Sequence, residues 1–133
     1  MNLRRDVVIL ACAVSAGIHG ALAPEHFEEG VGAGIGFVVS TILLAALAIV
    51  LTTRPASSVP LAWAAIVFAG LLVSYVLAIT VGFPLLHLEP EPVDGLALAT
   101  KAFEVVGLLT ALNLLRRRPA ASLTFINPKG TLA

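Results

Sequence analysis

The sequence predicts an all-α fold, a bundle of four transmembrane helices, and three observations lead to it. Of the 133 residues, 59% are hydrophobic and only 12% are charged, whereas a soluble domain carries about 25% charged residues. A soluble fold of this length has too much exterior to bury so much apolar surface. The apolar residues also fall into four runs, each close to the roughly 20 residues that a helix needs to cross a bilayer. The formal net charge of zero argues against nucleic acid as a partner.

The predicted spans cover residues 7–23, 31–51, 61–83 and 96–115. We expect the first to end before Pro24, because proline disfavours helix in the preceding residue. Pro60 suits the first turn of the third, and Asp94 can cap the fourth. The runs are too long and continuous for barrel strands, and helices satisfy the backbone hydrogen bonds that lipid cannot. Residues 1–118 then form one membrane domain, followed by a cytoplasmic tail at residues 119–133.

The basic residues predict the orientation of this bundle. Seven of the eight Lys and Arg residues lie before the first span, between the second and third, or after the fourth. These three regions share one side of a four-span topology, and short loops rich in Lys and Arg stay in the cytoplasm. We therefore expect a multi-pass protein of the plasma membrane, with both termini cytoplasmic and the two acidic loops extracytoplasmic.

The first 23 residues also fit a second interpretation. The run MNLRRDVVILACAVSAGIHGALA has a basic start, an apolar stretch and a small-residue end, which is typical of a signal peptide. Cleavage would remove His19 and leave three spans in the same orientation. We expect instead that the segment remains as a membrane anchor. The single cysteine excludes an internal disulfide.

The two acidic loops and the helix ends beside them hold most of the polar chemistry. They contain six of the eight acids and two of the three histidines, and the third histidine lies about one turn inside the first span. Imidazoles mixed with carboxylates suit zinc, copper(II) or iron. The sequence therefore predicts a binding site for a transition-metal ion, copper or zinc, whose candidate ligands are His19, Glu25, His26, His87, Glu89 and Glu104. A haem clamped by His19 and His87 is a further alternative.

The fourth span carries Lys101 and Glu104, which lie three residues apart and share a helical face. Glu104 follows Leu96 by eight residues, so it lies roughly 12 Å deep, near the centre of the bilayer. Ionisable residues at that depth are costly and usually face the bundle interior, often with a function. One interpretation is a mutually neutralising pair that fixes helix register. The other is the midpoint of a proton or small-ion path, with His19 as its outer relay.

The first span offers a matching polar face. Cys12, Ser15 and His19 are spaced i, i+3 and i+7, so they line one stripe of the helix. We expect Cys12 to be a small packing residue. A histidine inside lipid needs a partner, and the candidates are Glu104, a backbone group or a metal ion. No arrangement of nucleophile, base and orienting group occurs, so enzymatic activity is not predicted.

The start of the second span carries Gly32, Gly36 and Ser40 at every fourth position. This small-xxx-small stripe is the usual surface for close helix packing in membranes, either inside a bundle or between protomers. The spacing of its glycines does not match a phosphate-binding loop. The stripe supports an alternative function, in which the chain is a homo-oligomer or an accessory subunit of a larger membrane complex and its acids form a docking surface.

Two stretches, HGALAPEHFEEGVGAGIGF and EPEPVDGLALATKAFEVVGLL, resemble a group of small four-span actinobacterial membrane proteins without an assigned activity. The likeness lies in the pattern H-x-A-L-A-P-E-H-F-x-E and in a P-E-P-x-D run that leads into a span with a glutamate. The resemblance implies that His19, Glu25, His26 and Glu104 form one constellation. It implies neither a ligand nor a reaction.

Overall fold

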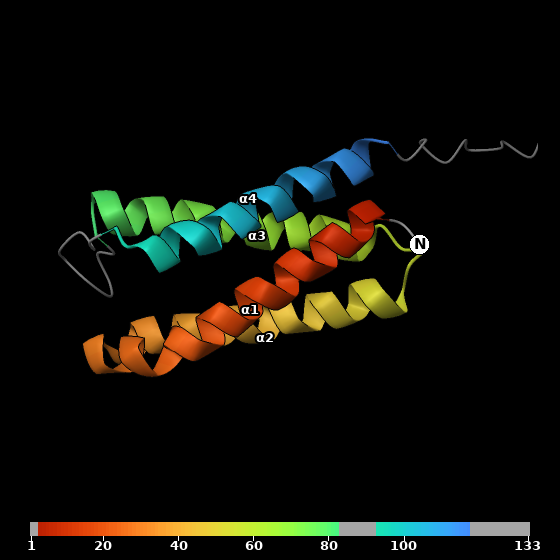
Figure 1. Cartoon of the computed structure of the whole chain (residues 1–133). Coiled ribbons are helices and arrows are strands. Elements are labelled where there is room, and N and C mark those ends of the chain that lie inside the picture. Colours follow the sequence, from red (N-terminus) through yellow and green to blue (C-terminus); the bar gives the residue numbers. More distant parts are fainter. Residues whose placement is uncertain (1–2, 83–92, 118–133) are drawn as a thin grey trace, which may run out of the picture.

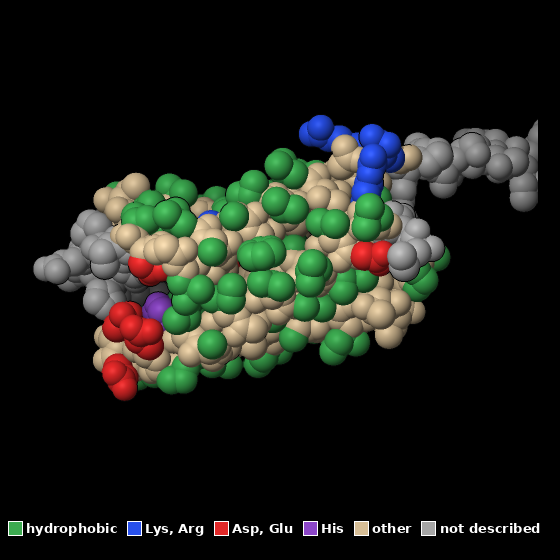
Figure 2. Space-filling view, in the orientation of Figure 1, with side chains coloured by type: hydrophobic (Ala, Val, Ile, Leu, Met, Phe, Trp, Pro, Cys, Tyr) green, Lys and Arg blue, Asp and Glu red, His purple; other side chains and the backbone are tan. Residues whose placement is uncertain are grey.

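The computed structural model describes residues 3–82 and 93–117, and this part of the chain is helical, with no strand. Its four helices are α1 (Leu3–Glu29), α2 (Val31–Thr53), α3 (Val59–Thr80) and α4 (Gly95–Arg116) (Figure 1). All four are long and apolar enough to cross a membrane. Large hydrophobic side chains are exposed over the outside of the bundle (Figure 2), which suits contact with lipid. The predicted all-α, four-helix fold is confirmed.

The helices pack in the spatial order α2, α1, α4, α3. α1 makes its most extensive contacts with α2 and also packs along α4, whose other side packs on α3. The contact between α2 and α3 is much smaller. α1 and α4 therefore each pack on two other helices (Figure 1), and a buried polar group on the faces where they meet is hidden from lipid.

The two ends of the bundle differ in charge. The start of α1, the connection between α2 and α3 and the end of α4 lie together at one end (Figure 1). This arginine-rich end carries Arg4, Arg5, Arg54, Arg116 and Arg117. The opposite end holds the turn between α1 and α2, where acidic side chains gather beside a histidine (Figure 2). Five arginines thus lie at one end and the acids of the α1–α2 turn at the other, while Asp6 is an acid of the arginine-rich end.

α1 is longer than predicted, and the expectation that Pro24 ends the first span is wrong. Pro24 lies inside α1, which continues beyond it by more than a turn. A proline in a helix removes one backbone hydrogen bond. Contacts made by the next turn offset this loss, because Phe27 packs directly on Gly34 of α2 and His26 stacks on Phe37.

The apolar core fills the half of the bundle nearest the arginine-rich end. Buried side chains from all four helices meet there, namely Val8, Cys12, Leu44, Leu51, Leu61, Phe68 and Ala111. Gly107 lets α4 approach α1 and α3 closely. A Cβ atom at Gly107 would lie 2.6 Å from the ring of Phe68 and 2.9 Å from the Cβ of Ala11.

The ends of α3 and α4 follow ordinary capping chemistry. The Asp94 carboxylate accepts a hydrogen bond of 2.7 Å from the backbone N–H of Ala97, as predicted for a cap of the fourth helix. Pro60 lies in the first turn of α3, also as predicted. α3 ends at Thr80, before the predicted boundary, and Gly82 then adopts a φ of 69°. This left-handed conformation is typical of the residue that follows a helix C-terminus.

Arg5 joins α1 to the connection between α2 and α3. Its buried guanidinium donates to the backbone carbonyl oxygens of Leu51 at 3.0 Å, Arg54 at 2.8 Å and Ser57 at 3.4 Å. Carbonyl groups at the end of a helix carry partial negative charge and lack partners within the helix. Arg5 therefore satisfies the end of α2 and fixes it to α1.

Candidate functional site

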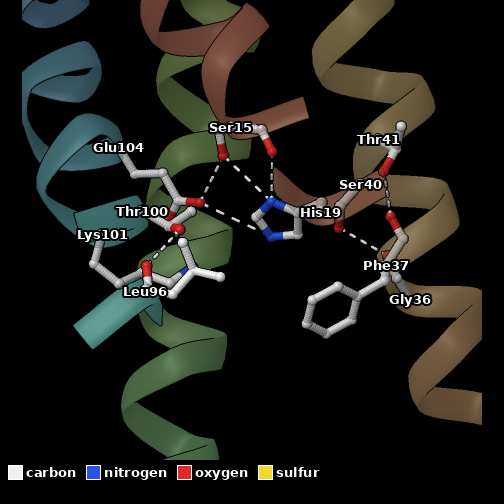
Figure 3. Close-up of polar contacts among 10 residues, drawn as sticks. All are labelled: Ser15, His19, Gly36, Phe37, Ser40, Thr41, Leu96, Thr100, Lys101 and Glu104. Carbon is white, nitrogen blue, oxygen red and sulfur yellow. Dashed lines mark hydrogen bonds and ion pairs between the residues drawn. The ribbon is translucent and has the colours of Figure 1, made fainter. Parts of the chain in front are cut away.

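Five polar or charged side chains are buried in the described part of the chain, and four of them lie together. Ser15 and His19 come from α1, and Thr100 and Glu104 come from α4 (Figure 3). The two members of each pair are four residues apart, which places them on one helical face. Because all four side chains are buried, the cluster lies inside the bundle and away from lipid.

Glu104 is the centre of this cluster and is fully buried. The hydroxyl of Ser15 donates to its Oε1 at 2.8 Å, and the ammonium of Lys101 donates to its Oε2 at 2.8 Å. Lys101 and Glu104, which the sequence places on one helical face, are thus in direct contact. A donor from the neighbouring helix and a cation from its own helix satisfy both carboxylate oxygens, an arrangement that suits a charged carboxylate.

The ring of His19 is oriented by the backbone of its own helix. Its Nδ1 lies 2.9 Å from the carbonyl oxygen of Ser15, and a carbonyl can only accept, so Nδ1 carries a hydrogen and donates. Its Nε2 lies 3.9 Å from Oε1 of Glu104. When the ring is neutral, Nε2 is an acceptor, and two acceptor atoms then face each other. A proton or a cation between them makes this contact favourable.

Tyr75 of α3 borders the site, and no pattern in the sequence pointed to it. The ammonium of Lys101 lies 5.4 Å from the centroid of the Tyr75 ring, within the range of a cation–π interaction. The Tyr75 hydroxyl is buried, and no residue of the described part accepts a hydrogen bond from it. The sequence offered one weak signal, namely that Tyr75 is the single tyrosine of the chain and lies within an apolar span.

Phe37 of α2 contacts two of the predicted site residues. The ring of His26 stacks on Phe37 with centroids 3.6 Å apart, and the ring of His19 lies 5.2 Å from the same centroid. His26 is partly exposed, and its Nε2 lies 3.9 Å from Oε2 of Glu29. Because α1 continues through Pro24, His19 and His26 share one face of the helix. Phe37 therefore lies between the histidine at the rim and the buried one.

The structure brings together two of the predicted metal ligands, His19 and Glu104. His26 contacts Phe37 and Glu29, and Glu25 is exposed at the rim. The predicted ligands His87 and Glu89 lie outside the described residues. Within residues 3–82 and 93–117, no group of three or more His, Cys, Asp or Glu side chains could hold a metal ion. The predicted metal site therefore stays a prediction.

The stripe of Gly32, Gly36 and Ser40 makes no close helix contact at its centre within the described chain. Gly36 is exposed, and a Cβ atom there would meet nothing within 4 Å. The Ser40 hydroxyl donates back to the Gly36 carbonyl at 2.8 Å (Figure 3). α1 and α2 approach closely elsewhere, at Gly34 and at Gly20. Gly36 therefore does not pack inside the bundle, and contact of the stripe with another protomer or with a larger membrane complex stays a prediction.

Comparison of the chain with protein-family models, with curated proteins and with solved structures found no match. The function is therefore inferred from the geometry of the residues alone.

Proposed function

We propose that this membrane protein binds a proton between His19 and Glu104, in the interior of its helix bundle. The observation that carries the proposal is the 3.9 Å gap between Nε2 of His19 and Oε1 of Glu104. A neutral His19 presents a lone pair to the carboxylate, whereas a protonated His19 presents an N–H group and a positive charge. One proton thus converts two opposed acceptors into an attractive pair.

The charges around the gap suit the gain and loss of one proton. Lys101 balances the charge of Glu104 at 2.8 Å, so the cluster has no net charge when His19 is neutral. A bound proton gives the cluster a charge of +1. The face of an aromatic ring attracts cations, and Phe37 lies 5.2 Å from the His19 ring. The protonated His19 ring therefore has two partners, the Glu104 carboxylate and the Phe37 ring.

The rim supplies a route to this site. His26 and Glu29 lie 3.9 Å apart at the end of α1, and His26 is only partly buried. We propose that they form the outer access point and that Phe37 is the barrier between them and His19. Following the positive-inside rule, the arginine-rich end is cytoplasmic and the access point faces the extracytoplasmic side.

The other half of the bundle limits what one chain can do. Between the cluster and the arginine-rich end lie the buried apolar side chains of Val8, Phe68 and Ala111, together with Cys12. Protons need polar groups or water to cross a membrane. This packing favours a site that binds a proton and couples it to helix packing or to a partner. Conduction across the membrane would need polar groups from another copy or another protein.

Side-chain nitrogen NMR on histidine-labelled protein in lipid nanodiscs tests the proposal. A His26→Gln/His87→Gln variant leaves His19 as the only histidine. We expect Nε2 of His19 to gain a proton reversibly as the pH is lowered, while Nδ1 stays protonated. Glu104→Gln should move the pH midpoint of this protonation. Thr100→Val, which alters a buried hydroxyl that donates to Leu96, is the matched control. An Nε2 signal that is constant over the whole pH range in which the fold persists would refute the proposal.

A transition-metal ion is the second candidate, because the same gap presents a nitrogen and an oxygen ligand. A further ligand has to come from His26, His87 or Glu89. Elemental analysis with an optical spectrum distinguishes the two candidates. Stoichiometric copper or zinc that is lost in a His19→Ala/His26→Ala variant supports a metal site, and a haem band would identify a haem instead. No bound metal after loading with copper and zinc excludes this candidate and leaves the proton site intact.

A further inference from the structure

A surface groove between α1 and α4 lies at the arginine-rich end. Its lining consists of Arg4 from α1 and of Leu109, Thr110 and Asn113 from α4. Nη1 of Arg4 donates to Oδ1 of Asn113 at 3.0 Å, so the amide holds the guanidinium at the groove. The groove therefore combines a cation, an amide and a hydroxyl with an apolar side chain.

The polarity of α4 changes in order along this groove. Leu109, Asn113, Arg116 and Arg117 are spaced i, i+4, i+7 and i+8, so they follow one face of the helix. Leu109 is 62% exposed, and both arginines are exposed at the helix end, where Lys and Arg side chains gather (Figure 2). Leu109 and Arg116 are roughly 10 Å apart along the axis. A membrane passes from hydrocarbon to the outer edge of its headgroups within a similar depth, about 5–8 Å.

We propose that this groove binds one anionic glycerophospholipid. Arg4, Arg116 and Arg117 contact the phosphate, Thr110 and Asn113 face the glycerol and ester groups, and an acyl chain lies on Leu109. Arginine suits this task because its planar guanidinium donates to two phosphate oxygens at once. Basic pockets between membrane helices are known to hold such headgroups. A free phosphate ion would use the cations but not the apolar part of the groove.

Arg4 and its neighbour Arg5 have separate tasks. Arg5 is buried and donates to three backbone carbonyl oxygens, so its guanidinium serves the fold. Arg4 is exposed, and its described hydrogen bond goes to a side chain of the groove. Arg54 lies at the same end of the bundle but does not line the groove. Arg54→Gln therefore removes an equal charge from the same end and serves as the control.

Native mass spectrometry of the detergent-purified protein with added phosphatidylglycerol or phosphatidylcholine tests the site. We expect phosphatidylglycerol to bind more tightly than phosphatidylcholine. An Arg4→Gln/Arg116→Gln variant should bind phosphatidylglycerol about 25-fold more weakly, from about fivefold per arginine. Arg54→Gln should bind it as the unmodified protein does. Equal binding of the two lipids, an equal loss in Arg54→Gln, or a protein dimer in place of the lipid-bound monomer would overturn the proposal.

A second measurement keeps the charges intact, in case the arginine variant fails to fold. In a Trp63→Phe background, Leu109→Trp places the only indole at the groove, and Leu98→Trp places it at an exposed site near the other end of α4. Brominated phosphatidylglycerol quenches a nearby indole. We expect brominated phosphatidylglycerol to quench the Leu109→Trp variant more strongly than brominated phosphatidylcholine does. The two brominated lipids should quench the Leu98→Trp variant to the same extent. Equal quenching by the two lipids at both positions would overturn the proposal.

Discussion

His19 presents its Nε2 to Oε1 of Glu104 at 3.9 Å because its Nδ1 donates to the carbonyl oxygen of Ser15 at 2.9 Å. The backbone of α1 thus sets which side of the ring faces α4. The pair can exist only while α1 and α4 keep their present register. The proposed proton would bind the packed bundle and not separated helices, so proton binding and the packing of α1 on α4 would stabilise each other.

The first prediction concerns the buried ion pair. Glu104→Gln should lower the free energy of unfolding by about 3 kcal/mol, because it leaves the mostly buried Lys101 ammonium without its counter-charge. Equilibrium unfolding in mixed micelles of lipid-like and denaturing detergent, followed by circular dichroism, measures this change.

A double variant provides the control for this prediction. Lys101→Met/Glu104→Gln removes both charges, and replacing a whole buried pair is often close to neutral. We therefore expect it to recover most of the stability that Glu104→Gln loses. If the double variant loses the sum of the two single effects, Lys101 and Glu104 do not stabilise each other and the prediction is wrong.

The second prediction concerns Phe37 as a barrier. Phe37→Ala removes the ring that lies against both His26 and His19, so His19 should exchange protons with the outer solution faster. A pH jump on reconstituted protein, followed by the infrared bands of the histidine ring, measures the rate. Phe103→Ala removes an exposed ring of α4 and should leave the rate unchanged. Equal rates in all three proteins would show that Phe37 is no barrier.

The helices and the Lys101–Glu104 contact were predictable because their causes are local. Runs of apolar residues give the spans, and two ionisable residues three positions apart on a helix must share a face. The burial of Glu104 followed from the cost of a charge in lipid. These arguments need no knowledge of which helices are neighbours.

The rest of the site depends on contacts between helices. Pro24 is tolerated inside α1 because Phe27 packs on Gly34 of α2, and this contact cannot be predicted from the sequence. Phe37 and Tyr75 are aromatic residues in apolar spans. Only the packing of the helices brings Phe37 to His19 and Tyr75 to Lys101. The small-residue stripe around Gly36 has the pattern of a packing surface, yet Gly36 faces outward. Another face of α2, which carries Gly34, packs on α1 instead.

The third prediction concerns Arg5. Arg5→Gln should lower the free energy of unfolding by at least about 2 kcal/mol, because several charge-assisted hydrogen bonds to backbone carbonyls are lost. Hydrogen–deuterium exchange should rise over residues 51–58, where α2 ends and the connection to α3 follows. Arg4→Gln removes the neighbouring charge and should leave that exchange unchanged. Equal exchange in both variants would show that Arg5 does not hold this connection.

The fourth prediction concerns Gly107. Gly107→Ala should lower the free energy of unfolding by about 1–3 kcal/mol, because the added Cβ would lie 2.6 Å from the Phe68 ring and force it to move. Gly36→Ala is the matched control, since nothing lies within 4 Å of its Cβ and alanine favours the helix. The same micelle unfolding experiment compares the two. Equal stability of the two variants would mean that α4 does not need a glycine where it crosses Phe68.

The fifth prediction tests the outward-facing stripe as a contact between protomers. Gly36→Leu should leave the stability of the single chain unchanged, because the new side chain points into open space. If copies of the chain pack through this face, the same variant should separate them, because close helix packing in membranes needs small residues. Native mass spectrometry after release from nanodiscs reports the oligomeric state of both proteins. An assembly that survives Gly36→Leu would move the contact to another face, whereas an assembly lost without loss of helicity would place it on Gly36 and Ser40.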